Sequence, residues 1–231
     1  MASDDIWIIG VSMTKFMRYK DKDLIDLASE AALAALDDAG VTIQDMDILA
    51  SGNLAEAGGG VGQRFQKQIG QTGIPVYNVA NACATGATAF RVVHTAIKAG
   101  EASIGLAIGS EQMGKAGMLG AAGRARSDKK EFEPSGRYGG VMGTEGILGT
   151  NMMPGTFAQT GMEYAYEHDG VGFEQFAKVA EKNHAHSVLN PLAQYQKAFA
   201  LDEIMGGEMI AYPNTLLMCC PPVTGRPPRW S

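Results

Sequence analysis

The chain has 231 residues, of which 45% are hydrophobic and 19% are charged, and its formal net charge at pH 7 is −6. This balance is typical of a folded globular protein and excludes a disordered chain, a collagen or a coiled coil as the overall architecture. The mild acidic excess gives no electrostatic footprint for nucleic acid or a membrane surface, and three cysteines are too few for a disulfide framework. No apolar run approaches the roughly 20 residues that span a bilayer, and MASDD does not resemble a signal peptide, so the sequence predicts a cytoplasmic protein.

The first fifty residues predict a strand, a helix and a second strand. The apolar run Ile6–Val11 is typical of a strand that is buried on both faces. Asp23 is a candidate N-cap for the following helix, whose apolar residues recur at helical spacing as far as Gly40, the expected C-cap. A second strand is expected at Ile48–Ala50, before the glycine-rich sequence AGGGVG.

The next segment repeats this alternation of strand and helix. The β-branched and aromatic residues of VYNVA, at 76–80, predict a strand, and the small residues that follow predict a helix ending at Gly100. SIGLAIG, at 103–109, is expected to be another buried strand. Alternation of this kind predicts right-handed crossovers and a largely parallel sheet.

The composition changes after Gly109. Residues 110–160 are rich in glycine and methionine, and a helical pattern returns between Met162 and Val188, interrupted by two glycines. We expect a lobe of loops and helices in this region rather than another layer of sheet.

Cys83 is the first candidate for chemistry. It lies in N-A-C-A-T-G, after a predicted strand and at the start of a predicted helix. A helix N-terminus offers unpaired N–H groups and the positive end of the helix dipole, and both favour a thiolate. Small neighbours allow a substrate to come close, and Thr85 is placed to form a local hydrogen bond. The alternative is a buried structural cysteine, and the local pattern leaves both open.

The other candidate groups give weaker signals. Cys219 and Cys220 are adjacent, without a histidine nearby in the sequence, so we expect buried residues at a strand end rather than a metal site. AGGGVG lacks the spacing of phosphate-binding loops, which favours a flexible loop. Four histidines are expected to be packing or surface residues, and a basic cluster is expected to be a solvated face balanced by neighbouring acids. The histidines are His94, His168, His184 and His186, and the cluster comprises Arg124, Arg126, Lys129 and Lys130.

Two stretches of the sequence carry a resemblance to a known family. VYNVANACATGATAFRVVHTAIKAGEASIGLAIGSEQM, at 76–113, resembles the nucleophile region of the thiolase superfamily. In that region a strand delivers a cysteine to the start of a buried helix, and the next strand ends in a G-x-E-x-M signature, here Gly109, Glu111 and Met113. The N-terminal IIGVSMTKF is similar to the first strand of the same group.

The second stretch narrows the resemblance to the sterol-carrier-protein thiolases, also called lipid-transfer thiolases. It contains the run K-N-H-x-H-S-V-x-N-P, from Lys182 to Pro191, and the ending L-L-x-C-C-P, from Leu216 to Pro221. The resemblance implies an α/β fold, the N-terminal half of a thiolase, in which a βαβαβ mixed sheet has helices on both faces and an inserted loop and helical lobe. It implies a core at 1–114, a loop domain that holds coenzyme A at 115–207, and a return strand to the core at 208–231.

The resemblance also implies an activity. Cys83 matches the acyl-accepting nucleophile, whose thiolate attacks a 3-ketoacyl-CoA, releases acetyl-CoA or a similar fragment and passes the acyl group to free CoA. Coenzyme A is then a substrate, with no permanently bound cofactor and no metal. The chemistry needs hydrogen-bond donors for two successive oxyanions, and the helix start contributes its dipole and the N–H of Cys83. Family members assemble through this half, so a homodimer is expected.

The sequence departs from the family pattern at its C-terminal end. Family members have two similar halves, and the second supplies a histidine that activates the nucleophile and a second cysteine that moves substrate protons. This chain stops where that half begins, and neither its histidines nor Cys219 and Cys220 occupy those positions. We therefore expect little activity from the chain alone, and association with itself or with a second polypeptide that supplies the other half.

The last residues, GRPPRWS, stand where the family has an alanine-rich segment. Alanine codons read one base out of frame give arginine and proline codons, so we interpret the tail as a frameshifted reading. A chosen boundary or a natural short paralogue is the alternative.

Two other functions stay open at this point. Some steroid-degrading lipid-transfer relatives are thiolase-like aldolases, which cleave a carbon–carbon bond without acyl transfer to a cysteine; the presence of Cys83 favours the thiolase. The other alternative is a non-catalytic subunit that binds acyl-CoA or a partner protein.

Overall fold

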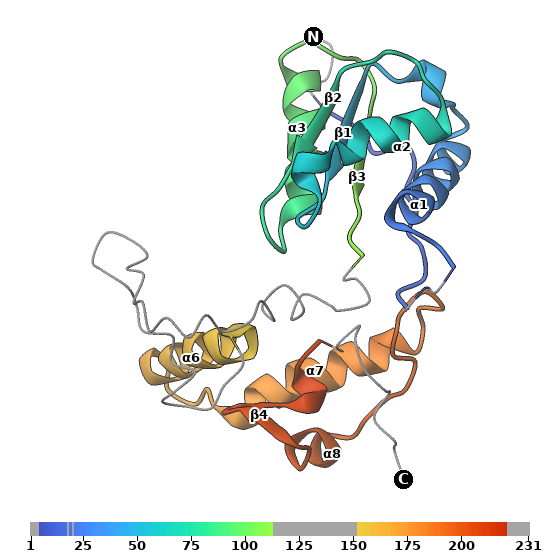
Figure 1. Cartoon of the computed structure of the whole chain (residues 1–231). Coiled ribbons are helices and arrows are strands. Elements are labelled where there is room, and N and C mark those ends of the chain that lie inside the picture. Colours follow the sequence, from blue (N-terminus) through green and yellow to red (C-terminus); the bar gives the residue numbers. More distant parts are fainter. Residues whose placement is uncertain (1–4, 18, 20, 113–151, 221–231) are drawn as a thin grey trace, which may run out of the picture. The chain divides into compact units, whose positions relative to one another are not determined.

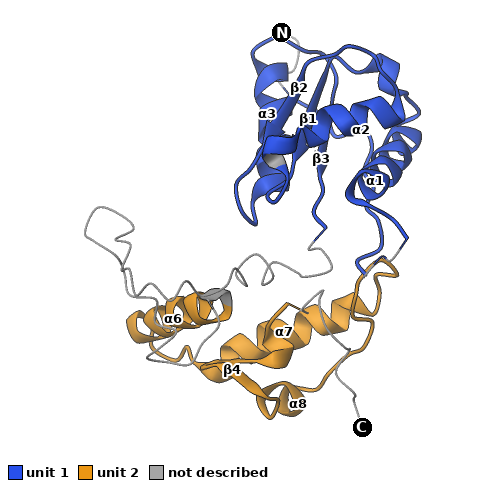
Figure 2. Ribbon diagram, viewed as in Figure 1, with its two compact units in different colours: residues 1–115 blue, residues 116–231 orange. Residues whose placement is uncertain are grey.

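The computed structural model describes residues 5–17, 19, 21–112 and 152–220 (Figure 1). The chain divides into two compact units, residues 1–115 and 116–231, which Figure 2 shows in two colours. The basic cluster at 124–130, the signature residue Met113 and the tail GRPPRWS lie outside the described residues. Within the described ranges, no helix has both the length and the apolar character needed to cross a bilayer.

The core of the first unit is a parallel sheet with the strand order β2–β1–β3. Its strands are β1 (Ile48–Gly52), β2 (Val76–Val79) and β3 (Gly105–Gly109), and Ala50 pairs with Tyr77 on one side and with Ala107 on the other. The three strands predicted at these places are confirmed, and so is the parallel sheet. Because all three strands are parallel, their carboxyl ends meet at one edge of the sheet.

Helices cover both faces of this sheet (Figure 1). On one face, α1 (Leu24–Ala39) and α2 (Val61–Ile69) enclose a core that includes Leu49 of β1. On the other face, α3 (Thr85–Lys98) packs against the next residue of the same strand, Ala50. Alternate residues of β1 therefore face opposite helical layers, as the pleat of a strand requires. The predicted α/β fold class is confirmed.

The caps predicted for α1 are present. The side chain of Asp23 accepts a hydrogen bond of 2.9 Å from the N–H of Asp26, and the side chain of Asp26 accepts one of 3.1 Å in return from the N–H of Asp23. At the other end Gly40 has φ 69°, a left-handed conformation that glycine adopts without steric cost. The flexible loop predicted at AGGGVG is wrong, because this sequence forms a 3-10 turn at Ala57–Gly59 and the start of α2, a helix that the sequence analysis did not predict.

The strand predicted at Ile6–Val11 is wrong. This segment is not paired in a sheet within the described residues, and Trp7 and Ile8 are 77% and 67% exposed. The segment instead lies against α1, where Gly10 is so close to the backbone of Ala35 that a side chain would not fit. An apolar run without alternation predicts an extended segment but does not specify what it packs against. The pattern alone therefore led us to expect a neighbouring strand, where the structure has a helix.

The second unit is a lobe of helices with a short antiparallel hairpin, as the sequence predicts for its helical part. Its core cluster consists of Ala177, Phe199, Ile204 and Leu217. The elements are α6 (Met152–Glu167), α7 (Phe173–Ser187), α8 (Leu201–Met205), β4 (Met209–Ala211) and β5 (Asn214–Thr215).

The L-L-x-C-C-P stretch was expected to be a strand, and in the structure it begins with a 3-10 turn, Leu216–Met218. Leu217 enters the core of the lobe, and its carbonyl accepts a hydrogen bond of 2.9 Å from Nε2 of His184. The carbonyl of Leu217 is thus bonded to a side chain, whereas the sequence led us to expect a bond to a neighbouring strand. The two cysteines are not deeply buried, since Cys219 is partly exposed and Cys220 is exposed. The domain boundaries at 114 and 207 stay predictions.

Candidate functional site

Cys83 lies in the turn between β2 and α3, at the carboxyl edge of the sheet. Its thiol is free and exposed, so a buried structural cysteine does not describe this residue. The helix begins two residues later, at Thr85. The sequence predicted this position for Cys83, while its catalytic role stays a prediction.

The turn around Cys83 is held by short-range hydrogen bonds. The hydroxyl of Thr85 accepts a bond of 2.8 Å from the N–H of Asn81 and donates one of 2.6 Å to the carbonyl of Ala82. The side-chain amide of Asn81 donates a further bond of 3.0 Å to the hydroxyl of Thr88. Ala82 has φ 44°, a left-handed conformation that costs energy in a residue with a Cβ atom. Cys83 therefore follows a strained residue, in a turn that hydrogen bonds hold between the residues before and after the cysteine.

Two glycines allow α3 to approach the edge of the sheet closely. A Cβ atom on Gly52, at the end of β1, would lie 2.7 Å from the carbonyl oxygen of Thr85. A Cβ atom on Gly109, at the end of β3, would lie 2.8 Å from Cα of Gly86. Both neighbours are backbone atoms that cannot rotate away, so the first turn of α3 would have to move. Gly109 is also the first residue of the signature noted in the sequence.

A polar network joins the ends of β1 and β3 beside this turn. Asn53 is 1% exposed, and its amide donates a hydrogen bond of 2.7 Å to the carbonyl of Ser110. Next to it, the N–H of Leu54 donates a bond of 2.8 Å to the carboxylate of Glu111. The sequence pointed to Glu111 through its signature and missed Asn53. The available signal was an amide directly after an apolar strand, a position where parallel sheets place functional polar residues.

The electrostatics of the turn favour an anion. The first turn of α3 contains no acidic residue. Among the described residues, no backbone carbonyl outside the helix accepts a hydrogen bond from the N–H of Gly86 or Ala87. Free N–H groups and the positive end of the helix dipole both stabilise negative charge at a helix N-terminus. The start of α3 thus offers hydrogen-bond donors to an anion that forms beside Cys83.

The structure does not bring a histidine to Cys83 within the first unit. His94 lies three turns along α3, where its ring faces the ring of Phe90 at 6.4 Å between centroids. The other three histidines, with Cys219 and Cys220, belong to the second unit. Within the described ranges, no group of three or more histidine, cysteine or acidic side chains is arranged to hold a metal ion.

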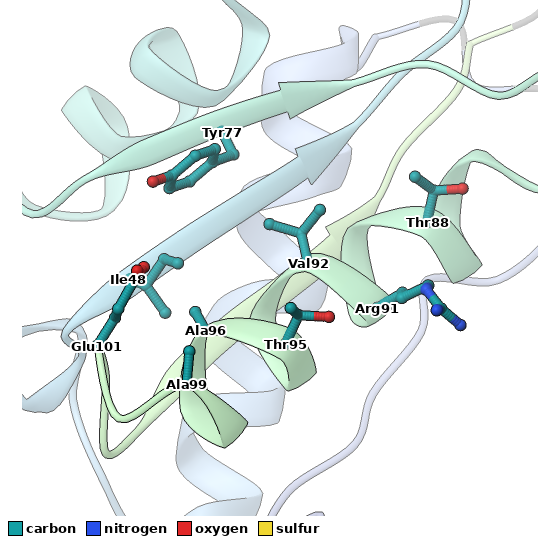
Figure 3. Close-up of a pocket in the computed structure, with 9 residues that line it drawn as sticks. All are labelled: Ile48, Tyr77, Thr88, Arg91, Val92, Thr95, Ala96, Ala99 and Glu101. Atoms are coloured by element: carbon teal, nitrogen blue, oxygen red, sulfur yellow. The ribbon is translucent and has the colours of Figure 1, made fainter.

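A groove of about 350 Å³ lies beside α3, away from the thiol. Figure 3 shows it between Tyr77 of β2 and the side chains of Arg91, Val92 and Thr95 on α3. Cys83 is not among its lining residues.

Comparison with known proteins gives a consistent picture. The family described as "Thiolase, N-terminal domain" matches residues 6–205. Sterol carrier protein 2 from Gallus gallus is 35% identical over 224 residues, which cover 95% of this chain and 40% of that protein. The acetyl-CoA acetyltransferase of Methanothermobacter thermautotrophicus is 32% identical over 222 residues, which cover 94% of this chain and 54% of that protein. The chain thus spans about half, or less, of the length of these relatives.

A solved Ltp2-ChsH2(DUF35) aldolase shares the fold. It superposes with a TM-score of 0.63 at 23% sequence identity, over 93% of this chain and 52% of that chain. This likeness supports the α/β fold class of the chain. The resemblance to thiolases of the sterol-carrier and lipid-transfer group, first seen in the sequence motifs, is confirmed by the relatives.

Proposed function

Because the chain belongs to the thiolase family through its N-terminal domain, we propose that it supplies the nucleophile of an acyl transfer between coenzyme A thioesters, with Cys83 as the acyl acceptor. One observation carries the proposal: the exposed Cys83 thiol lies at the start of α3, where N–H groups are free. This is the environment in which a cysteine acts as a thiolate nucleophile.

In the proposed reaction the Cys83 thiolate attacks the 3-keto carbonyl of a 3-ketoacyl-CoA. A bond forms between Sγ and that carbon, and the bond between C2 and C3 of the substrate then breaks. The departing acetyl-CoA carbanion takes up a proton, and the thiolate of free CoA then attacks the acyl-enzyme and restores Cys83. We propose that N–H groups at the start of α3 donate to the oxyanion that forms at each attack. Coenzyme A is a substrate here, not a resident cofactor.

The proton transfers of this reaction need an acid–base group, and the described residues of the first unit bring no histidine to Cys83. His94 faces Phe90, and no other histidine belongs to the first unit. We therefore propose that this chain acts together with a second half, provided by another polypeptide or by a longer form of the protein, and that it also associates as a homodimer. The purified chain alone is then expected to show little thiolysis, and robust turnover by this chain would overturn that part of the proposal.

Selective alkylation tests the nucleophile. Cys220 is also exposed, so it serves as an internal reference for an exposed thiol of the second unit, and the partly exposed Cys219 is a second reference. The chain is treated briefly with iodoacetamide at neutral pH, and the modified cysteines are mapped by mass spectrometry. The proposal predicts that Cys83 is modified first, whereas equal labelling of Cys83 and Cys220, or no labelling of Cys83, would contradict it.

The acylation step alone is tested with acetyl-CoA. In this step one thiolate replaces another at the thioester, with no net proton transfer, so it is expected even without the second half. The expected product is an acetyl group on the peptide that contains Cys83, and the Cys83→Ala variant is expected to lack it. An aldolase or a non-catalytic subunit would bind CoA thioesters without this adduct. Complete absence of the adduct, with an intact and reactive thiol, would therefore favour these alternatives.

A further inference from the structure

We propose that Thr85 is a positioning residue for Cys83, through a hydroxyl group that holds the strained turn in which the thiol is presented. The inference rests on the proposed function, because it concerns the same thiol. The inference gives Thr85 a role in fixing the position of the nucleophile without contact to the substrate. Thr85 comes two residues after Cys83 in the sequence.

The hydroxyl of Thr85 is fully used by the turn. It accepts a hydrogen bond of 2.8 Å from the N–H of Asn81 and donates one of 2.6 Å to the carbonyl of Ala82. The two bonded residues come directly before Cys83, and Thr85 comes shortly after it. The hydroxyl therefore closes a loop, residues 81–85, that contains the exposed thiol of Cys83.

The position of Thr85 is itself fixed by packing. The residue is 6% exposed. A Cβ atom on Gly52 would lie 2.8 Å from Cγ2 of Thr85, so the methyl group sits directly against the end of β1. The methyl group of this buried side chain packs against a strand, and its hydroxyl bonds within the turn. The side chain therefore holds the turn in a fixed position relative to the sheet.

The turn needs such support because of Ala82. Its φ of 44° lies in the left-handed region, and a non-glycine residue stays there only when its surroundings hold it. The Thr85 hydroxyl bonds to the carbonyl of this same residue, and the Thr85 N–H donates to it as well, at 3.2 Å. Without the hydroxyl, Ala82 keeps only the weaker bond from the Thr85 N–H and is expected to relax toward an ordinary conformation, which would move Cys83 relative to the start of α3. The influence of a helix terminus falls off within one turn, so a small rotation matters.

Three variants test the proposal by the alkylation rate of Cys83 relative to that of Cys220 in the same sample. Thr85→Val keeps the shape and removes the hydroxyl, and it is expected to slow the relative rate about tenfold, as the loss of a buried hydrogen bond predicts. Thr85→Ser restores the hydroxyl and is expected to react like the unaltered chain. Thr95→Val is the matched control, since Thr95 is exposed on the same helix and its side chain has no hydrogen bond among the described residues; its rate is expected not to change.

A fourth variant keeps the test decisive if Thr85→Val folds poorly. Glycine adopts a positive φ without strain, so Ala82→Gly combined with Thr85→Val is expected to recover much of the lost rate. The inference is overturned if Thr85→Val labels as fast as the unaltered chain, if Thr85→Ser is as slow as Thr85→Val, or if the double variant recovers nothing. These outcomes are separate from a failure of the proposed function, which shows as unselective labelling of Cys83 in the unaltered chain.

Discussion

The side-chain amide of Asn53 donates a hydrogen bond of 2.7 Å to the carbonyl of Ser110, and so joins the ends of β1 and β3. The carbonyl oxygen of the same side chain accepts a bond of 2.5 Å from the N–H of Glu56. A polar side chain that is 1% exposed is tolerated because both of its polar groups have partners. This amide therefore fixes the spacing of two strand ends at the edge of the sheet where the Cys83 turn lies.

Replacing Asn53 with alanine is expected to destabilise the first unit. The carbonyl of Ser110 and the N–H of Glu56 would both lose a partner, and because both bonds are only partly buried, we expect a total loss of about 1–3 kcal/mol. Urea denaturation followed by circular dichroism measures the change in the free energy of unfolding. The matched control is Asn190→Ala, because Asn190 is exposed and its side chain accepts a bond of 2.9 Å from the N–H of Leu192. A similar loss in both variants would contradict the prediction.

Adding a methyl group at the sheet edge is expected to disturb both stability and the thiol. Gly52→Ala and Gly109→Ala place a Cβ atom against the backbone of α3, and relief of such overlap typically costs about 1–3 kcal/mol. Because α3 has to shift, the alkylation rate of Cys83 is expected to fall as well. Gly58→Ala is the control, since nothing lies within 4 Å of a Cβ atom at that position. An effect on stability no larger than that of the control would show that the helix accommodates the methyl group.

The alternation of strands and helices could be read from the sequence because its signals are local. Asp23 and Gly40 mark the ends of α1 by their own capping chemistry, and the position of Cys83 follows from the strand before it and the small residues after it. These features depend on neighbours within a few residues. They needed no knowledge of the tertiary fold.

The features that sequence reading missed depend on distant partners or on backbone angles. Ile6–Val11 has the composition of a buried strand, but composition does not choose between a strand and a helix as the surface it packs on. The bond from Asn53 joins residues 57 positions apart. The positive φ of Ala82 could not be anticipated, because alanine rarely adopts it unless the surrounding turn holds it there.

Two aspartates are expected to make the stability of the chain fall in acid. Hydrogen bonds to the carboxylate lower the pKa of Asp26, first from the N–H of Asp23 and then from Gln68. Bonds from the N–H and the hydroxyl of Thr42 lower the pKa of Asp45. A carboxyl group whose pKa is lower in the folded state stabilises that state above its unfolded pKa, about 4, and this stabilisation is lost as the pH falls through the folded value.

The variant that carries Asp26→Asn and Asp45→Asn is therefore expected to melt below the unaltered chain at pH 7, with the two melting temperatures converging as the pH falls below about 4. Thermal denaturation between pH 3 and pH 7 measures this difference. Asp37→Asn is the control, because the Asp37 side chain has no hydrogen bond among the residues that the structure describes. A difference that stays constant over the whole range would contradict the assigned role of these two carboxylates.

Two histidines on α7 are expected to differ sharply in their contribution to the second unit. The ring of His184 is 9% exposed, bonds to the carbonyl of Leu217 at 2.9 Å and meets the ring of Phe199 edge to face, with 4.9 Å between centroids. His184→Ala removes this packing and leaves the carbonyl unpaired, a loss of about 2–4 kcal/mol. His186 lies two residues along the same helix and is exposed, so His186→Ala is expected to change the free energy of unfolding by less than about 0.5 kcal/mol. Urea denaturation of both variants measures the difference, and equal losses would show that His184 does not anchor the turn at Leu216–Met218 to the helices.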